Sequence, residues 1–433
     1  MMFSSAAWGQ TSSPLSFKEC VEIALEQNED IQKNRIRRQM AASTVKGAEA
    51  AFLPSLSASV GQSLSYSPFL SSSSGTGAST SDKLVQSGSY GVSADWVVWD
   101  GGSRSNTLKS SRLAEDIAGL TTTTSENALK ESIAKVYIQI LYTLDAIKVN
   151  EALLADDEML YKRSVELMNN GQMSRSEVAQ LKAQYENGRY DLVNTQTTLR
   201  NYLFQLKQLV YLTDLDREIY VAPLSDDGES RLADIPAKLT VYGNALQSRP
   251  EIQSADLALQ QSELQTKIAR AGLMPTVSLT GGIADGHSTA YSRNFFNQMK
   301  SNLNTTLGVS VSIPLYDRRT TKTAVEQAKY NELISKLDIQ DVRKELFNTI
   351  EGYWLDAVNN KQMYEAAKSS AESAQESYDL LEEKFNLGLS NISDIATGRA
   401  TLLNAKQSML QSKYTCLLNI ALLNFYNGRI LDI

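Results

Sequence analysis

Two short breaks in otherwise helical sequence, each followed by an acidic side chain, hold the residues with the clearest local chemistry. Ser174 stands three residues before Glu177, and Asn391 stands three residues before Asp394. Such side chains accept hydrogen bonds from free backbone N–H groups at a helix start, and a carboxylate in the first turn interacts favourably with the helix dipole. Each break also contains a glycine, which permits the positive φ of a helix-ending turn: Gly171 and Gly388. The pattern predicts that one helix ends and the next begins at each break, with the acids in a capping role.

Enzyme chemistry is not indicated anywhere in the sequence. His287 is the only histidine, and the two cysteines, Cys20 and Cys416, do not form a CxxC pair. The sequence therefore predicts no catalysis, no metal site and no cofactor. His287 is expected to be a solvated loop residue and the cysteines to be buried, with their pairing left open. The net charge of -7 argues against a nucleic-acid partner.

The chain is an internal duplication. Residues 24–32 match residues 245–253 at an offset of 221. Residues 91–100 match residues 308–317 at an offset of 217, which the two break glycines share. Each half is expected to run helix, strand, loop, strand, very long helix, break, helix.

Long proline-free stretches predict long helices. No proline occurs between Pro68 and Pro223. Within this stretch, residues 103–169 would span roughly 100 Å as one helix. Apolar residues recur there at steps of three and four, from Ile133 to Ile147. Helices of this length are expected to pack side by side in a bundle, rod or tube.

Four segments that alternate between apolar and small polar residues are predicted as strands. They lie near residues 52–66, 89–100, 274–284 and 305–316. Such segments suit a tilted transmembrane β-strand, and equally a soluble sheet with one buried face. Long polar loops at 71–81 and 285–300 favour the membrane alternative. Four strands cannot close a membrane barrel, so two or three chains would have to share one.

The N-terminal stretch is expected to be the remnant of an export signal. Residues 1–14 contain small residues around Ala6 and Ala7, as at a signal cleavage site, although the basic start and a full apolar core are missing. No run of about 18 apolar residues is present, so no transmembrane helix is expected.

These features resemble the TolC family of outer-membrane efflux channels over nearly the whole chain. The most specific match is the helix-tip stretch at residues 387–407. The strand-to-helix junctions at 99–102 and 313–319 also match, although Arg318 and Arg319 replace the glycines of the family pattern.

The resemblance implies a mainly α fold with a membrane β-barrel. Three copies would each give four β-strands to one 12-stranded barrel in outer membrane lipid, and the long helices would form an α-helical coiled-coil tunnel in the periplasm. Residues 15–212 and 240–433 would be the two repeats. Residues 213–239 would link them in a belt midway along the tunnel, together with the C-terminal tail.

The implied function is that of a passive exit duct in a tripartite efflux system. The homotrimer would conduct drugs or metal ions from a periplasmic adaptor and an inner-membrane pump of RND or ABC type. The outer-membrane channel of a type I protein secretion system is an alternative that the sequence does not separate. A structural coiled-coil protein without a pore is an alternative of a different class, but it would not need four amphipathic strands.

The resemblance also assigns roles to individual residues. The pore gate would be lined by Asp394, Glu177 and Thr397, the last at a position where some members carry a second acid. Three copies of Asp394 would form a carboxylate ring that attracts cations. Helix tips that contact the adaptor would contain Gly171, Gln172, Ser174, Gly388, Leu389, Ser390 and Asn391. The strand–helix junction of the barrel would contain Trp99, Asp100, Gly101, Gly102 and Asp317.

Overall fold

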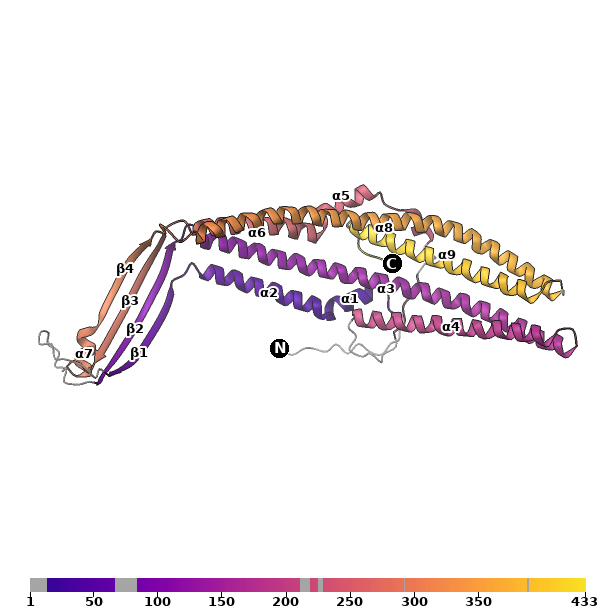
Figure 1. Cartoon of the computed structure of the whole chain (residues 1–433), viewed down its shortest axis with the longest axis horizontal. Coiled ribbons are helices and arrows are strands. Elements are labelled where there is room, and N and C mark those ends of the chain that lie inside the picture. The colour runs from indigo at the N-terminus through magenta and orange to yellow at the C-terminus, as the bar shows by residue number, and fades with distance from the viewer. Residues whose placement is uncertain (1–13, 67–83, 211–218, 225–228, 292, 388) are drawn as a thin grey trace. The chain divides into compact units, whose positions relative to one another are not determined.

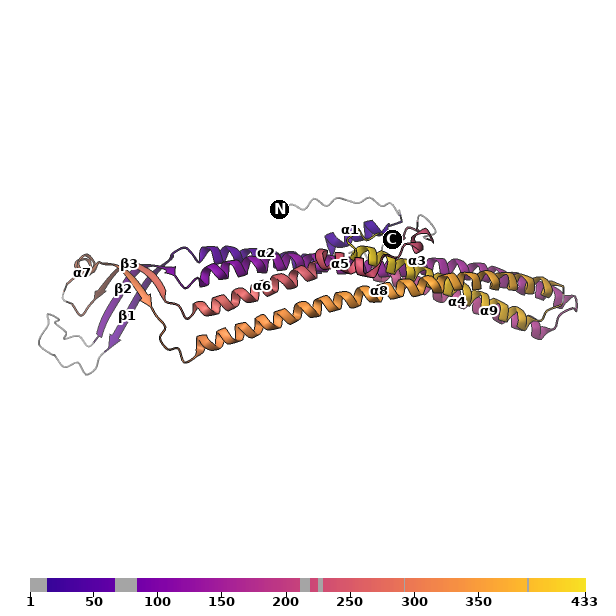
Figure 2. The same ribbon diagram turned by 90° about the horizontal axis from the view of Figure 1, so that it is seen from above.

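The computed structural model of the protein describes residues 14–66, 84–210, 219–224, 229–291, 293–387 and 389–433. The chain forms two compact units. The first combines Met1–Ile36, Leu120–Gln253 and Gln340–Ile433, and the second combines Arg37–Gly119 and Ser254–Ile339. The unit boundaries differ from the repeat boundaries because two very long helices run through both units (Figures 1 and 2).

The elements occur in the same order in both halves of the chain. The first half contains α1 (Phe17–Gln27), α2 (Glu29–Ala50), β1 (Ser55–Tyr66), β2 (Leu84–Trp99), α3 (Ser103–Asn169) and α4 (Arg175–Val210). After a short 3₁₀ helix at Glu229–Ala233, the second half contains α5 (Lys238–Ser248), α6 (Pro250–Ala271), β3 (Thr276–Ser288), α7 (Phe295–Asn302), β4 (Asn304–Ser312), α8 (Thr320–Asn386) and α9 (Ile392–Tyr426). Both α3 and α8 are 67 residues long, which confirms the duplication and the predicted helix at 103–169.

Local capping explains where the first helices begin. The Ser16 hydroxyl accepts a hydrogen bond from the Glu19 backbone N–H (3.3 Å), and the Glu19 carboxylate accepts one from the Ser16 N–H (2.8 Å). Asn28 caps α2, because its side-chain oxygen accepts hydrogen bonds from the N–H groups of Asp30 and Ile31. None of the helices in the described residues has an apolar stretch long enough to cross a membrane.

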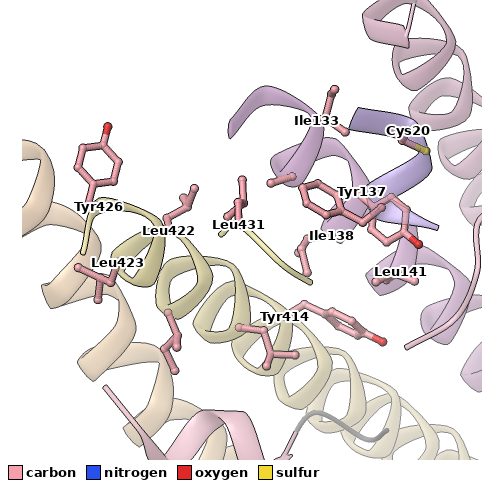
Figure 3. Close-up of a cluster of buried hydrophobic side chains, with 14 of the residues drawn as sticks. Cys20, Ile133, Tyr137, Ile138, Leu141, Tyr414, Leu422, Leu423, Tyr426 and Leu431 are labelled. Atoms are coloured by element: carbon pink, nitrogen blue, oxygen red, sulfur yellow. The ribbon is translucent and has the colours of Figure 1, made fainter. Parts of the chain in front are cut away.

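The apolar stripe of α3 is part of the first unit's main core, together with side chains of α9 (Figure 3). Ile133 and Ile140 are fully buried, as predicted. The Tyr137 hydroxyl donates a hydrogen bond to the carbonyl of Ala222 (3.0 Å), so the described part of the inter-repeat linker lies on α3. Leu431, from the C-terminal tail, belongs to the same core. Burial of these side chains holds the two repeats together in this unit.

The second unit contains one antiparallel sheet with the strand order β1-β2-β3-β4. Among the described residues, β1 and β4 each pair with one strand only, so each has a free edge. Matched positions such as Leu56, Ala94, Gly281 and Leu307 lie across all four strands. The alternation read from the sequence therefore becomes two chemically different faces of one sheet.

Several predicted boundaries in this unit were wrong. β4 ends at Ser312, because Pro314 has no N–H to continue the ladder, so Tyr316 lies beyond the strand. β3 continues to Ser288 through its pairing with β2, which places His287 in a strand rather than in a loop. The predicted polar loop at 285–300 contains most of α7. The other predicted loop, residues 71–81, lies outside the described residues.

Candidate functional site

The first helix tip, between α3 and α4, is closed by two capping motifs. Gly171 has φ 74°, its N–H donates to the carbonyl of Met168, and the N–H of Gln172 donates to the carbonyl of Leu167. These two bonds form a Schellman motif, which ends α3. Only a residue that tolerates positive φ fits this turn without strain, which explains the glycine.

The start of α4 then carries a complete capping box. The Ser174 hydroxyl accepts from the Glu177 N–H (3.2 Å), and the Glu177 carboxylate accepts from the Ser174 N–H (2.8 Å). These hydrogen bonds lower the pKa of Glu177, because they favour its charged form. The capping role predicted for both residues is confirmed.

The second helix tip, between α8 and α9, repeats this design with different side chains. The N–H of Leu389 donates to the carbonyl of Lys384 (2.8 Å), as Gln172 does to Leu167 at the first tip. Asn391 caps α9, because its side-chain oxygen accepts from the Asp394 N–H (2.9 Å). Gly388 lies outside the described residues.

The second tip leaves its acid less constrained than the first. Asp394 accepts a hydrogen bond from the Ser390 hydroxyl at 3.3 Å, which is a long contact between exposed groups. Thr397 is also exposed, and its hydroxyl donates to the carbonyl of Ser393 in its own helix. Asp394 therefore presents a carboxylate to solvent, whereas Glu177 uses its carboxylate within the cap.

The first strand–helix junction is held by an aspartate and two glycines. The Asp100 carboxylate accepts from the N–H and the guanidinium of Arg104, both at 3.0 Å. Gly101 and Gly102 have φ of 68° and 83°. Trp99 ends β2 and is 44% exposed. The two positive φ values turn the chain from the sheet into α3.

The second junction keeps this backbone without glycine. The Asp317 carboxylate accepts from the Thr321 N–H at 2.7 Å, as Asp100 does from Arg104. Arg318 and Arg319 have φ of 55° and 69°, in the left-handed region that L residues rarely adopt. The departure from the family pattern therefore changes the side chains and not the turn.

The two faces of the sheet differ in chemistry. One face carries exposed apolar side chains, including Leu56 (76% exposed) and Leu307 (81% exposed). The other carries mainly serine, threonine and glycine, and hydroxyls such as those of Ser57 and Ser93 contact each other at 2.8 Å. Asp95 is the one charged residue among the described strand residues of this second face.

Sequence reasoning missed two side-chain clusters. His287 stacks on Tyr90 (6.0 Å between ring centroids) and contacts Phe295 edge-on (4.8 Å), so it is not a freely solvated residue. In the first unit, Arg399 forms an ion pair with Asp157 (2.6 Å) inside the helical core. The sequence contains a signal for this pair, because Arg399 lies at a position that continues the apolar stripe of α9, where a charged side chain is unusual. Within the described residues, no three His, Cys, Asp or Glu side chains form a group that could hold a metal ion.

The fold is that of outer-membrane channel proteins. Over 98% of this chain and 95% of the other, it superposes on CusC, whose structures concern transmembrane channel formation, with a TM-score of 0.80 at 16% sequence identity. It superposes on the outer membrane protein VceC from Vibrio cholerae with a TM-score of 0.79 at 16% identity, over 96% of this chain and 97% of that one.

The sequence matches the family model "Outer membrane efflux protein" over residues 20–210 and 241–428. The chain belongs to the outer membrane efflux protein family, and it is accordingly an outer-membrane protein. It is 25% identical to the outer membrane protein TolC of Salmonella enteritidis, in an alignment that covers 71% of this chain and 62% of that protein. The chain thus spans less than two thirds of the length of the TolC proteins from Salmonella enteritidis and Escherichia coli.

Proposed function

We propose that three copies of this chain form a passive exit duct, which conducts small molecules from a periplasmic adaptor and an inner-membrane pump to the cell exterior. The sheets of the three copies would close into one 12-stranded barrel in the outer membrane. The helices would form a tunnel in the periplasm. The family match and the channel folds of the structural neighbours support this function.

The observation that carries the proposal is the open, two-faced sheet. In the part of the chain that the structure describes, the free edges of β1 and β4 leave backbone N–H and C=O groups unpaired, which is too costly in lipid unless other strands complete the pairing. The exposed apolar side chains of one face match a lipid environment, and the small hydroxyl side chains of the other match a water-filled lumen. Edge-to-edge pairing between copies satisfies both requirements at once.

The helix tips would supply the selective part of the duct. A ring of three exposed Asp394 carboxylates would raise the local cation concentration, with Thr397 one turn later. Glu177 would contribute less, because its carboxylate is already bound to the Ser174 backbone. Gln172 and Leu389, which precede the capped helices, are exposed and would meet the adaptor.

Protein secretion is the second candidate function. The chain is 22% identical to the alkaline protease secretion protein AprF of Pseudomonas aeruginosa, in an alignment that covers 69% of this chain and 61% of that protein. A lumen lined by small, mostly uncharged side chains would serve a protein as well as a drug. The identity of the adaptor and pump that copurify with the chain would distinguish small-molecule efflux from protein secretion.

Single-channel recording in planar bilayers, with the mass measured in the same detergent, tests the proposal. We expect a trimer mass and small cation-selective openings, and we expect Asp394→Asn to reduce cation selectivity. Ser390→Ala is the matched control, because it removes the neighbouring hydroxyl and keeps the charge. A monomer that never inserts would refute the duct, and unchanged cation selectivity in Asp394→Asn would show that Asp394 has no role in the pore.

A further inference from the structure

Between Ile392 and Leu402, the side of α9 that faces its neighbouring helices contains one charged residue in an apolar stripe. Ile395 and Leu402 are fully buried and Ile392 is nearly so, at spacings of three and seven residues. Arg399 occupies the position between Ile395 and Leu402 that completes this stripe, and its side chain is 11% exposed. Burying a guanidinium costs free energy unless an oppositely charged group lies next to it, so Arg399 requires an acidic partner within the helical core.

The site around Arg399 is formed by three helices of the first unit, α3, α4 and α9. The Arg399 Nε lies 2.6 Å from the Asp157 Oδ2 of α3, and the Asp157 side chain is fully buried. The Gln184 amide of α4 donates to the other Asp157 oxygen at 2.6 Å. Gly188 of α4 provides the space that the two side chains occupy, since a Cβ there would lie 3.0 Å from the Arg399 Nη2 and 3.1 Å from the Asp157 Oδ2. The pair therefore ties α9 to both helices of the first hairpin.

The pair has no counterpart at the duplicated positions. The residue that matches Asp157 in the second repeat is Ala374, which is buried, and the residue that matches Arg399 in the first repeat is Lys182, which is exposed. When one helix slides or turns against another, one apolar contact replaces another with little change in free energy. A single buried ion pair forms in one register only, and it thereby selects that register at some cost in stability.

We propose that the Arg399–Asp157 pair positions α9, fixing its rotation and its axial register against α3 and α4. An α-helix turns by about 100° per residue. Asp394, five residues before Arg399, and Thr397, two residues before it, therefore point about 140° and 160° away from the buried arginine. Both are exposed, as this geometry requires. The inward arginine thus holds Asp394 and Thr397 on the opposite, solvent-facing side, and this consequence rests on the proposed function of Asp394 in the pore.

The test separates positioning from simple stability. The double variant Arg399→Leu with Asp157→Leu removes both charges and keeps an apolar seam of similar volume, so it is expected to fold even if a single variant does not. Its matched control is Glu158→Gln with Lys162→Gln, which removes an exposed ion pair one residue further along α3.

Spin labels at the exposed positions Met159 on α3 and Asn404 on α9 report the register. Labelled chains carry alanine at the two buried cysteines and are diluted with unlabelled chains, so that only distances within one chain are measured. We expect the parent and the control pair to give one narrow distance. The double leucine variant should give a broadened distribution or a shift of about 5 Å, one helical turn, with little change in melting temperature.

Cation selectivity is measured on the same variants. We expect the double leucine variant to lose selectivity as Asp394→Asn does, and Asp394→Asn to cause no further loss in that background. An unchanged distance distribution would overturn the positioning role. A shifted distribution with no effect of Asp394→Asn in the parent would support the positioning role and refute the pore acid.

Discussion

The glycine at the first strand–helix junction gives the sharpest stability prediction. Gly101 and Gly102 both have positive φ, so alanine at either position would incur roughly 1–2 kcal/mol of backbone strain. Alanine also restricts the unfolded chain, which offsets about 0.4–1 kcal/mol of that strain at both positions. For Gly102→Ala these two effects are the whole change, because the nearest atom to its added Cβ is the Asn106 Nδ2 at 3.9 Å. We expect this variant to lose about 1 kcal/mol.

Gly101→Ala adds a steric cost that Gly102→Ala lacks. Its Cβ would lie 2.7 Å from the Cβ of Met274 and 3.0 Å from the carbonyl oxygen of Ala271. The positions of both atoms are fixed by the backbone, at the last residue of α6 and in the turn that follows it, so neither can move as a flexible side-chain tip does. Overpacking of this kind costs about 1–3 kcal/mol, and we expect a total loss of about 2–4 kcal/mol for Gly101→Ala.

The assay is urea unfolding in one detergent, followed by circular dichroism, with the two alanine variants compared directly. The entropic and strain contributions are common to both, so the difference of about 1–3 kcal/mol measures the crowding alone. Arg318→Gly is the reverse change at the duplicated position, and it is expected to be neutral or to stabilise by up to about 1 kcal/mol, because strain relief and chain entropy oppose each other. Equal losses in the two alanine variants would refute the argument from crowding.

Two further predictions concern charged groups of the first unit. Arg249 is 6% exposed and pairs with Glu131 (3.2 Å), so Arg249→Met should destabilise the protein by about 3–5 kcal/mol, as measured by the same unfolding assay; a loss below 1 kcal/mol would contradict this. The lowered pKa of Glu177 means that its cap adds stability above the usual pKa of 4.5, and this stability is lost as the pH falls through the lower folded value. Glu177→Ala removes the carboxylate that accepts from the Ser174 N–H, so it should destabilise the protein at pH 7 and do so less at pH 3, whereas a pH-independent loss would exclude the carboxylate from the effect.

The long-range design of the fold was readable because it rests on periodicity and repetition. The 67-residue helix at 103–169 follows from a proline-free stretch with a continuous apolar stripe, and its copy follows from the constant offset. The capping residues Ser174 and Asn391 were also identifiable, because capping depends on neighbours three residues away.

The features that were missed depend on contacts between distant residues. β3 extends to Ser288 only because β2 pairs with it along that length, and no local pattern around His287 records this pairing. Likewise, the need for glycine at position 101 comes from the approach of Met274, which is far away in the sequence. The buried partner of Arg399 lies more than two hundred residues away on α3, so sequence could at most have flagged the arginine as out of place.

The differences between the two repeats are where the duplicated chain acquires its specific chemistry. The backbone is repeated closely: both tips use the same carbonyl-capping bond, and both junctions use two consecutive positive φ values. The side chains are not repeated, since the acid is engaged in a capping box at one tip, as Glu177, and largely free at the other, as Asp394. A second hairpin with a free acid needs a fixed orientation, and the Arg399–Asp157 pair, which also occurs once, provides it. Divergence of the repeats has therefore left a carboxylate outside the capping box at one tip and placed the pair that orients it in the same helix.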